Sequence, residues 1–309
     1  MIEIIGKIQK DPNCFKIDLR YYKSARDAMF DVVQELYGSG FIDVYIPGYI
    51  GWSSKEGSGI FDPLKSIEGL NRHYYRMSRE LLIDISSLES QMADSSILLI
   101  VNYFGFRDPD IKKIIDIAHE RGCVVIEDNA HGFYTYFCNE RIGSDVTFFS
   151  LHKMFPFTEG GGLIIENGDF DLPNSLKGKV DFDPFIYDYN AIARKRICNY
   201  KALSRLAKEY KPYFEPLRDE EFLKQNVPQT FPIVIKKGNR NEIYEIMNAQ
   251  GYGVVSLYHT MVEELRTNAH SDAMWLSQRI MNLPVHQDVN NEFYEKMLVA
   301  LAKACESTR

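Results

Sequence analysis

Apolar and polar positions follow two different periods along the chain. Residues 97–105 and 123–129 are almost continuously apolar, which is typical of strands buried on both faces of a parallel sheet. Between them, residues 108–122 begin with Asp-Pro, carry apolar side chains at helical spacing and end in glycine, which predicts a helix. Strand, helix and strand in this order form a βαβ crossover, so the sequence predicts an α/β fold with parallel strands.

Further segments follow the same two periods. Strands are predicted over residues 43–47, 145–151, 161–167, 230–236 and 253–258, and helices over 24–37, 189–210, 240–251, 271–284 and 290–305. The stretch 167–190 is rich in Asp, Pro, Asn and Gly and predicts a boundary between domains. We therefore expect a large domain over residues 1–180 and a smaller α+β domain over residues 181–309.

Composition narrows the class of protein. The 309 residues are 45% hydrophobic and 26% charged, as in ordinary soluble proteins, and the net charge of −7 argues against a nucleic-acid partner. Five cysteines are scattered without a Cys-x-x-Cys pair, which disfavours a disulfide scaffold or a structural zinc site. The N-terminus has no apolar stretch of the kind that signal peptides carry, and no later run reaches membrane-spanning length. We expect a cytoplasmic protein without membrane association.

Three polar clusters follow predicted strands. They are residues 47–54, 127–131 and 150–153, and ligands of parallel α/β sheets bind at such strand ends. The chain has neither the G-x-G-x-x-G turn of dinucleotide-binding proteins nor a P-loop. The clusters do contain Asp128 and Lys153, an acid and a lysine at the ends of neighbouring strands. Pyridoxal phosphate needs both, because a lysine holds its aldehyde as a Schiff base and a carboxylate keeps its ring nitrogen protonated.

The two stretches that carry these residues resemble a known family. "VVIEDNAHGF" (124–133) and "GSDVTFFSLHKMFPFTEGGGLIIEN" (143–167) are similar to the DegT/DnrJ/EryC1/StrS family of sugar aminotransferases. The resemblance implies a pyridoxal-phosphate-dependent transferase of fold type I, which has a mostly parallel central sheet flanked by helices and a smaller C-terminal domain. It also implies pyridoxal 5′-phosphate as the cofactor.

The resemblance assigns roles to four residues of these stretches. Asp128 matches the acid that meets the pyridine nitrogen, and His131 matches the His or Gln near the 3′-oxygen of the cofactor. Lys153 stands six residues before Glu159, as the Schiff-base lysine of the family does. Ser150 matches the strand serine that contacts the phosphate, although the interval from this serine to the lysine is shorter than in typical members.

Two segments nearer the N-terminus complete the resemblance. "YYKSARDAM" (21–29) is similar to the segment whose hydroxyl and backbone amides hold the phosphate at a helix start, with Ser24 and Ala25 as the matches. "YIPGYIGWSS" (45–54) is similar to the turn that places a side chain against the ring face of the cofactor. Either Gly51 or Trp52 stands at that position, and Trp52 is the candidate with a ring to stack.

Each of these residues also has a purely structural interpretation. A lysine after a strand is commonly a surface residue whose stem covers apolar neighbours, and an isolated Asp is commonly a cap. His152 points away from the site if the strand continues through it, because successive strand residues face opposite sides. Residues 194–196, Arg-Lys-Arg, read as a solvated helix face, and none of the C-terminal arginines is expected to face the site.

The sequence thus predicts an aminotransferase that acts through an internal aldimine on Lys153. Its expected substrate is the keto group of a nucleotide-linked sugar, because paired arginines for the carboxylate of a keto-acid are not evident. The expected donor is an amino acid such as glutamate, and the expected assembly is a homodimer. Two alternatives stay open: a sugar dehydratase of the same fold, in which histidine replaces the lysine, and a non-catalytic paralogue that binds cofactor or sugar nucleotide.

Overall fold

The computed structural model describes residues 18–55, 57–178 and 180–308. The N-terminal segment, on which part of the expectation of a cytoplasmic protein was based, lies outside the described residues, as does Cys14. The four described cysteines form no disulfide. Within the described ranges, no helix combines the length and the apolar character that crossing a bilayer requires.

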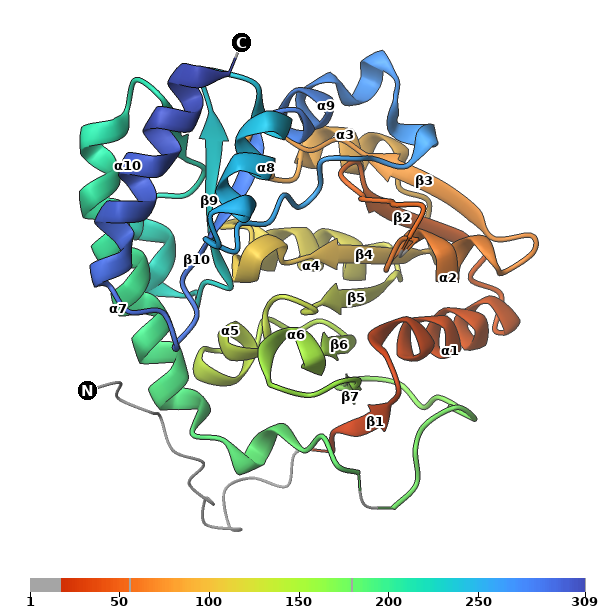
Figure 1. The fold of residues 1–309 in the computed structure, drawn as a ribbon. Coiled ribbons are helices and arrows are strands. Elements are labelled where there is room, and N and C mark those ends of the chain that lie inside the picture. The colour runs from red at the N-terminus through yellow and green to blue at the C-terminus, as the bar shows by residue number, and fades with distance from the viewer. Residues whose placement is uncertain (1–17, 56, 179, 309) are drawn as a thin grey trace.

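Seven strands form a mostly parallel sheet in the centre of the molecule (Figure 1). They are β1 (Arg20–Tyr22), β2 (Asp43–Pro47), β3 (Asn71–Tyr75), β4 (Ile97–Val101), β5 (Val124–Asp128), β6 (Val146–Ser150) and β7 (Gly161–Ile165). Their order across the sheet is β1-β7-β6-β5-β4-β2-β3. Strands β6, β5, β4, β2 and β3 are parallel neighbours, whereas β7 is antiparallel to β6 and β1 is antiparallel to β7. The predicted parallel arrangement around β4 and β5 is confirmed.

A second, antiparallel sheet follows in the C-terminal half. Its order is β10-β9-β8, and its strands are β8 (Phe214–Pro216), β9 (Thr230–Ile235) and β10 (Ile280–Pro284). Figure 1 shows α7 and α10 side by side along one edge of the molecule, and α8 packs against α10.

Ten α-helices connect and cover the strands. They are α1 (Ala25–Gly38), α2 (Phe61–Lys65), α3 (Ile85–Gln91), α4 (Ile111–Glu120), α5 (Phe133–Cys138), α6 (Leu151–Met154), α7 (Tyr189–Ala207), α8 (Arg240–Ala249), α9 (Ser271–Ser277) and α10 (Glu292–Ser307) within the described ranges. The largest buried apolar cluster contains residues of both sheets, so one continuous core joins them. The expected division at residue 180 stays a prediction.

Two predicted elements are wrong. Residues 253–258 form no strand, and Val255 makes only an isolated bridge to Asn282. Residues 271–284 are not one helix, because α9 ends at Ser277 and β10 begins at Ile280. The run from Ile280 to Leu283 is completely buried and pairs with β9, so pairing with a strand distant in sequence overrides the helical spacing.

The Glu-Gly-Gly turn before β7 holds two other elements in place. The Gly160 N–H donates a hydrogen bond to the Lys23 carbonyl at 2.8 Å, and the Leu151 N–H donates to the Gly160 carbonyl at 2.9 Å. Gly160 has φ +131°, a conformation that side chains disfavour. A Cβ at Gly161 would lie 2.6 Å from the Ala25 backbone nitrogen and closer still to the Ser24 carbonyl group. The start of α1 therefore approaches β7 only because residue 161 lacks a side chain.

This close approach predicts the effect of one methyl group. We expect Gly161→Ala to lower the free energy of unfolding by about 2–3 kcal/mol, because backbone atoms must move apart to admit the Cβ. Gly38→Ala on α1 is the matched control, since a Cβ there meets nothing within 4 Å. Urea unfolding of both variants measures the difference. Equal midpoints for Gly161→Ala and the wild type would contradict the proposed constraint.

Candidate active site

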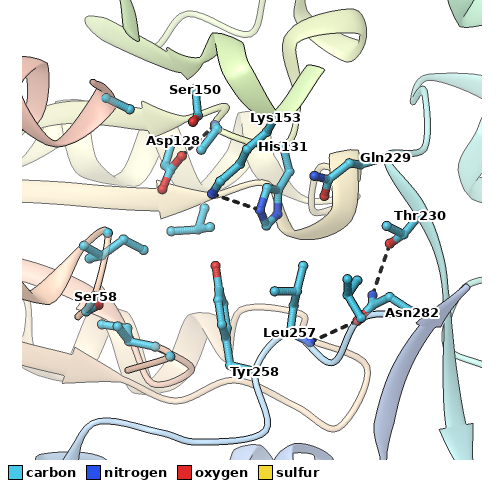
Figure 2. A pocket seen from close by; sticks show the side chains of 18 of the residues that line it. Ser58, Asp128, His131, Ser150, Lys153, Gln229, Thr230, Leu257, Tyr258 and Asn282 are labelled. Atoms are coloured by element: carbon cyan, nitrogen blue, oxygen red, sulfur yellow. Dashed lines mark hydrogen bonds between the residues drawn. The ribbon is translucent and has the colours of Figure 1, made fainter. Parts of the chain in front are cut away.

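A cavity of about 690 Å³ lies at the carboxyl ends of the parallel strands, between the large sheet and loops of the C-terminal half (Figure 2). The strand ends supply Asn102 after β4, Asp128 of β5 and Ser150 of β6. All seven candidate site residues from the sequence line this one cavity, namely Ser24, Ala25, Trp52, Asp128, His131, Ser150 and Lys153. The structure therefore brings together residues separated by up to 129 positions in the chain.

Lys153 reaches across the cavity to His131. Its Nζ lies 3.4 Å from His131 Nε2, and Figure 2 shows the two side chains converging. The other ring nitrogen, Nδ1, accepts the Phe104 N–H at 3.4 Å, so in the neutral ring the proton is on Nε2. Burial lowers the pKa of His131 well below its usual value, and the charge of Lys153 lowers it further. The imidazole is consequently neutral, and its Nε2 faces the lysine nitrogen.

Asp128 is the acid of this site. The side chain is buried, and its Oδ1 accepts the Ala130 N–H at 2.7 Å. Burial raises the pKa of Asp128 from 3.8 to about 6, while the Ala130 N–H and the charge of Lys153 oppose the rise. The carboxyl group is therefore mostly ionised at neutral pH but costly to keep ionised, a state that a cationic ligand atom would stabilise.

A buried hydrogen-bond network around Glu127 fixes the carboxyl end of strand β5. The carboxylate of Glu127 accepts from Arg107 Nε at 3.1 Å, from Asn102 Nδ2 at 2.6 Å and from Thr147 Oγ1 at 3.3 Å. Glu127 and Thr147 are fully enclosed, and Arg107 is almost so. Because these contacts fix the residue before Asp128, the orientation of the acid depends on them.

The short helix α6 explains the position of Lys153. The polypeptide turns from strand to helix at Ser150, so that His152 and Lys153 both line the cavity. The expectation that His152 points away from the site is therefore wrong, because it assumed a continuing strand. Ser150 Oγ lies 3.4 Å from His152 Nδ1, and burial lowers the pKa of His152.

The N-terminus of α1 forms another wall of the cavity. Ser24 is the N-cap, and its hydroxyl accepts the Asp27 N–H at 3.3 Å and donates to the Asp27 carboxylate at 2.8 Å. The first backbone N–H groups of a helix have no partner within it and carry partial positive charge. Ser24, Ala25 and Arg26 thus present an anion-binding helix end to the cavity, with the Asp27 carboxylate competing nearby.

The opposite wall comes from the C-terminal half, and sequence analysis missed it. The hydroxyl of Tyr258 points toward the space between Asp128 and Lys153 in Figure 2. Asn282, fully buried on β10, donates to Thr230 Oγ1 at 3.1 Å and accepts the Leu257 N–H at 3.1 Å. No local pattern in the sequence distinguishes these residues, because their positions depend on contacts between segments that are distant in the chain.

Gly51 and Trp52, the two candidates for the ring-stacking position, both line the cavity. The side chain of Trp52 is 43% exposed. The backbone N–H of Trp52 donates to the Thr260 carbonyl at 3.1 Å. A Cβ at Gly51 would overlap the ring of Tyr258. Gly51 therefore permits the approach of Tyr258, and a stacking role for Trp52 stays a prediction.

The position of Arg196 on α7 contradicts another expectation from the sequence. The sequence indicated a solvated face over residues 194–196 and no arginine at the site. Arg194 is exposed as expected, but Arg196 is 3% exposed and lines the cavity. The helical period places these two side chains two positions apart on different faces, and α7 packs the Arg196 face against the rest of the fold.

Comparison with known proteins supports the resemblance. Residues 78–171, which include Asp128 and Lys153, match the model of the DegT/DnrJ/EryC1/StrS aminotransferase family. A curated relative, the spore coat polysaccharide biosynthesis protein SpsC of Bacillus subtilis (strain 168), is 29% identical over 99 residues. That segment is 31% of this chain, and it spans a quarter of the length of the relative.

Solved structures cover nearly the whole chain. The putative sugar aminotransferase Spr1654 from Streptococcus pneumoniae, in its PMP form, has a TM-score of 0.74 at 13% identity over 93% of this chain and 88% of its own. E. coli GDP-4-keto-6-deoxy-D-mannose-3-dehydratase with bound hydrated PLP has a TM-score of 0.69 at 17% identity over 93% and 87%. The fold is that of pyridoxal-phosphate-dependent enzymes of fold type I. The resemblance to the DegT/DnrJ/EryC1/StrS aminotransferase family is likewise confirmed for residues 78–171.

The residues of this fold type I site fit the cofactor that the family and the neighbours imply. Asp128 offers a buried carboxylate for a ring N–H, and Lys153 offers a primary amine beside a neutral imidazole. The start of α1 offers backbone N–H groups to a phosphate. Acid, amine and anion site line one cavity, which is the donor set that pyridoxal phosphate requires.

The raised pKa of Asp128 predicts a measurable linkage between stability and pH. Between pH 4 and 6 the folded cofactor-free protein binds more protons than the unfolded chain, so this acid reduces stability as the pH rises through that window. We expect Asp128→Asn to be more stable than the wild type above pH 6 by about 3 kcal/mol, since two pKa units correspond to about that energy. The difference should vanish near pH 4.

Chemical denaturation of both proteins without cofactor at pH 4, 5, 6 and 7.5 checks this. Other groups titrate equally in wild type and variant, so only the difference between the two curves matters. A difference that stays constant with pH would show that Asp128 is not a strained buried acid.

Proposed function

We propose that this protein is a pyridoxal-phosphate-dependent aminotransferase that transfers an amino group to the keto group of a nucleotide-linked sugar. The observation that carries the proposal is the pairing of Lys153 Nζ with His131 Nε2 at 3.4 Å in the cavity that also contains Asp128. Lys153 is an exposed residue, yet its amine lies against a buried neutral histidine instead of extending into solvent.

The chain assigns a separate task to each residue. When bound, the cofactor supplies an aldehyde that can be exchanged between amines and a ring that accepts electrons. Asp128 holds a proton on the ring nitrogen through its carboxylate. Lys153 Nζ anchors the cofactor and, once displaced by the donor amine, moves a proton within the cavity. His131 presents its Nε2–H near the lysine nitrogen, and the helix end at Ser24 and Ala25, with Ser150, holds the phosphate.

The sugar class is inferred from what resembles this chain. A solved neighbour is described as a putative sugar aminotransferase, and a curated relative takes part in spore coat polysaccharide biosynthesis. The cavity of about 690 Å³ is lined on one side by the C-terminal loops and can admit a ligand larger than an amino acid. Glutamate is proposed as the generic amino donor.

A dehydratase of the same fold is the second candidate, because one solved neighbour is described as a 3-dehydratase. Both His152 and Lys153 line the cavity, but it is Lys153 that lies beside His131. His152 instead lies next to Ser150, toward the proposed phosphate end. This arrangement favours the aminotransferase.

The first test assigns the lysine. Protein loaded with pyridoxal 5′-phosphate should be yellow, and borohydride reduction followed by peptide mapping should place a pyridoxyl group on Lys153. Lys153→Arg should bind cofactor only reversibly and yield no adduct, whereas Lys65→Arg, a variant at an exposed lysine of α2, should behave as the wild type. An adduct on another lysine would refute the assignment.

The same loaded protein then tests the substrate class. Glutamate should convert the cofactor to its amine form, and a panel of nucleotide-linked keto-sugars and free keto-acids should be offered for the return reaction. We expect return with a keto-sugar. Return with free keto-acids alone would make the protein an amino-acid transaminase, and loss of a sugar hydroxyl without net amine transfer would make it a dehydratase.

We also propose a homodimer as the active species. The family resemblance implies that a second subunit completes the cavity. Sedimentation velocity of the loaded protein should give twice the mass of the chain. Full amine transfer by a monomer would contradict this proposal. The small domain over residues 181–309 is proposed to supply the sugar-binding wall, in agreement with Tyr258 and Asn282 on the cavity.

A further inference from the structure

Arg196 is an unusual residue for a cavity wall. Its side chain is almost completely buried, so its charge has lost most contact with water. Its NH1 donates to the Gln229 carbonyl at 3.1 Å, and its guanidinium lies over the ring of Tyr134, 5.0 Å from the ring centroid. Its Nε is enclosed and has no hydrogen-bond partner. These contacts orient the guanidinium but do not neutralise it.

No carboxylate of the described residues forms an ion pair with Arg196. The nearest acid to influence it is Asp288, whose side chain is 74% exposed and lies 3.7 Å from His286 instead. Burial lowers the pKa of Arg196, and Asp288 and Tyr134 offset this effect. An arginine nevertheless remains charged in proteins, so the fold encloses a cation whose opposite charge is not within contact distance.

Three other described arginines are buried, and their surroundings differ. Arg107 pairs with Glu127 at 3.1 Å. Arg218 and Arg240 donate to backbone carbonyls, Arg240 to those at the end of α9. None of these three lines the cavity. Arg196 alone among them combines burial, the lack of a contacting acid and a place on the wall of the proposed active site.

Two short chains of contacts connect Arg196 to the reacting end of the cavity. On one side, Gln229, which accepts from Arg196, donates its N–H to the Phe104 carbonyl at 2.8 Å, and Phe104 contacts His131. On the other side, the hydroxyl of Tyr134 donates to the Met154 carbonyl at 2.8 Å, directly after Lys153. The guanidinium is therefore tied through these contacts to the segments that carry His131 and Lys153, and all three residues line the same cavity.

We propose that Arg196 binds a carboxylate of the amino donor and thereby selects an amino acid as the source of nitrogen. This inference rests on the proposed aminotransferase function. A carboxylate accepts charge-assisted hydrogen bonds from a guanidinium and supplies the opposite charge that the cavity wall lacks. The proposed site for the phosphate of the cofactor is the helix end at Ser24, so Arg196, elsewhere on the cavity wall, serves a different anion.

The test uses L-glutamate and its two amides as probes. The loaded wild-type protein is mixed with L-glutamate, with L-isoglutamine, in which the α-carboxylate is an amide, and with L-glutamine, in which the γ-carboxylate is an amide. The apparent dissociation constant is read from the change in cofactor absorbance. We expect one amide to bind about 30- to 100-fold more weakly than glutamate, the loss associated with a charge-assisted hydrogen bond.

Arg196→Gln should weaken the binding of glutamate by a similar factor. It should also abolish the preference for glutamate over the amide that the wild type binds more weakly. Arg196→Lys should recover part of the affinity, because it restores charge without the planar fork. Arg194→Gln, an exposed residue on the same helix, is the matched control and should bind all three probes as the wild type does. Thermal unfolding of each variant shows whether the substitution has caused a folding defect. The comparison of the three probes with the wild-type protein does not depend on the folding of any variant.

A second measurement separates two sources of negative charge. The wild type and Arg196→Gln, both loaded with cofactor, are titrated calorimetrically with glutarate and with uridine diphosphate. We expect Arg196→Gln to weaken the binding of glutarate and to leave the binding of the nucleotide unchanged. If Arg196→Gln instead weakened the binding of the nucleotide and left that of glutarate unchanged, the inference would be overturned, and Arg196 would be assigned to binding of the acceptor substrate. Equal binding of glutamate by wild type and Arg196→Gln would also overturn it. If the wild type itself transfers no amine from glutamate, the proposed function fails instead.

Discussion

The approach of α1 to the Glu-Gly-Gly turn determines the geometry of the whole site. Gly161 leaves room for the backbone of Ser24 and Ala25, and Gly160 bonds to both Lys23 and Leu151. One turn thereby sets the distance between the N-terminus of α1, which offers N–H groups to an anion, and α6, which carries Lys153. A side chain at residue 161 would separate these elements, because two backbones packed this closely cannot yield to a methyl group without moving.

Within that frame, the electrostatics of the site follow from burial. Burial raises the pKa of Asp128 and lowers that of His131, since each charged form loses hydration in the cavity wall. The lysine keeps the acid partly ionised and the histidine neutral by its own positive charge. Two groups of opposite character, an anionic carboxylate and a neutral N–H donor, therefore flank one amine. Such separation of protonation states is typical of catalytic sites, and it explains why the three residues are useful only together.

The C-terminal half completes the cavity with residues from loops and strand ends. Asn282 accepts the Leu257 N–H and donates to Thr230 of β9, which ties the loop to the small sheet, and Tyr258 projects from this loop toward the acid. Arg196 closes the same wall from α7. Polar groups of this wall are where ligand selectivity is expected under the proposed function, because the residues proposed to hold the cofactor come from the large sheet and its connections. The contribution of Arg196 is electrostatic, and that of Tyr258 and Asn282 is the placement of hydrogen-bonding groups.

The sequence by itself determined the parallel part of the sheet and suggested Asp128 and Lys153 as a pair for a cofactor. Continuous apolar runs marked β4 and β5, and the family resemblance carried by Asp128, Lys153 and Glu159 implied the cofactor, since these signals are local in the sequence. Only the tertiary structure decided the remainder. Residues 271–284 became a helix and a strand because β9 was available to pair, and His152 entered the cavity because the strand turns into α6 at Ser150. Arg196 became a buried wall residue because α7 packs that face inward, which its basic neighbours in the sequence conceal. Contacts between distant segments carry no periodic signal along the chain, and for that physical reason they had to be seen in the fold.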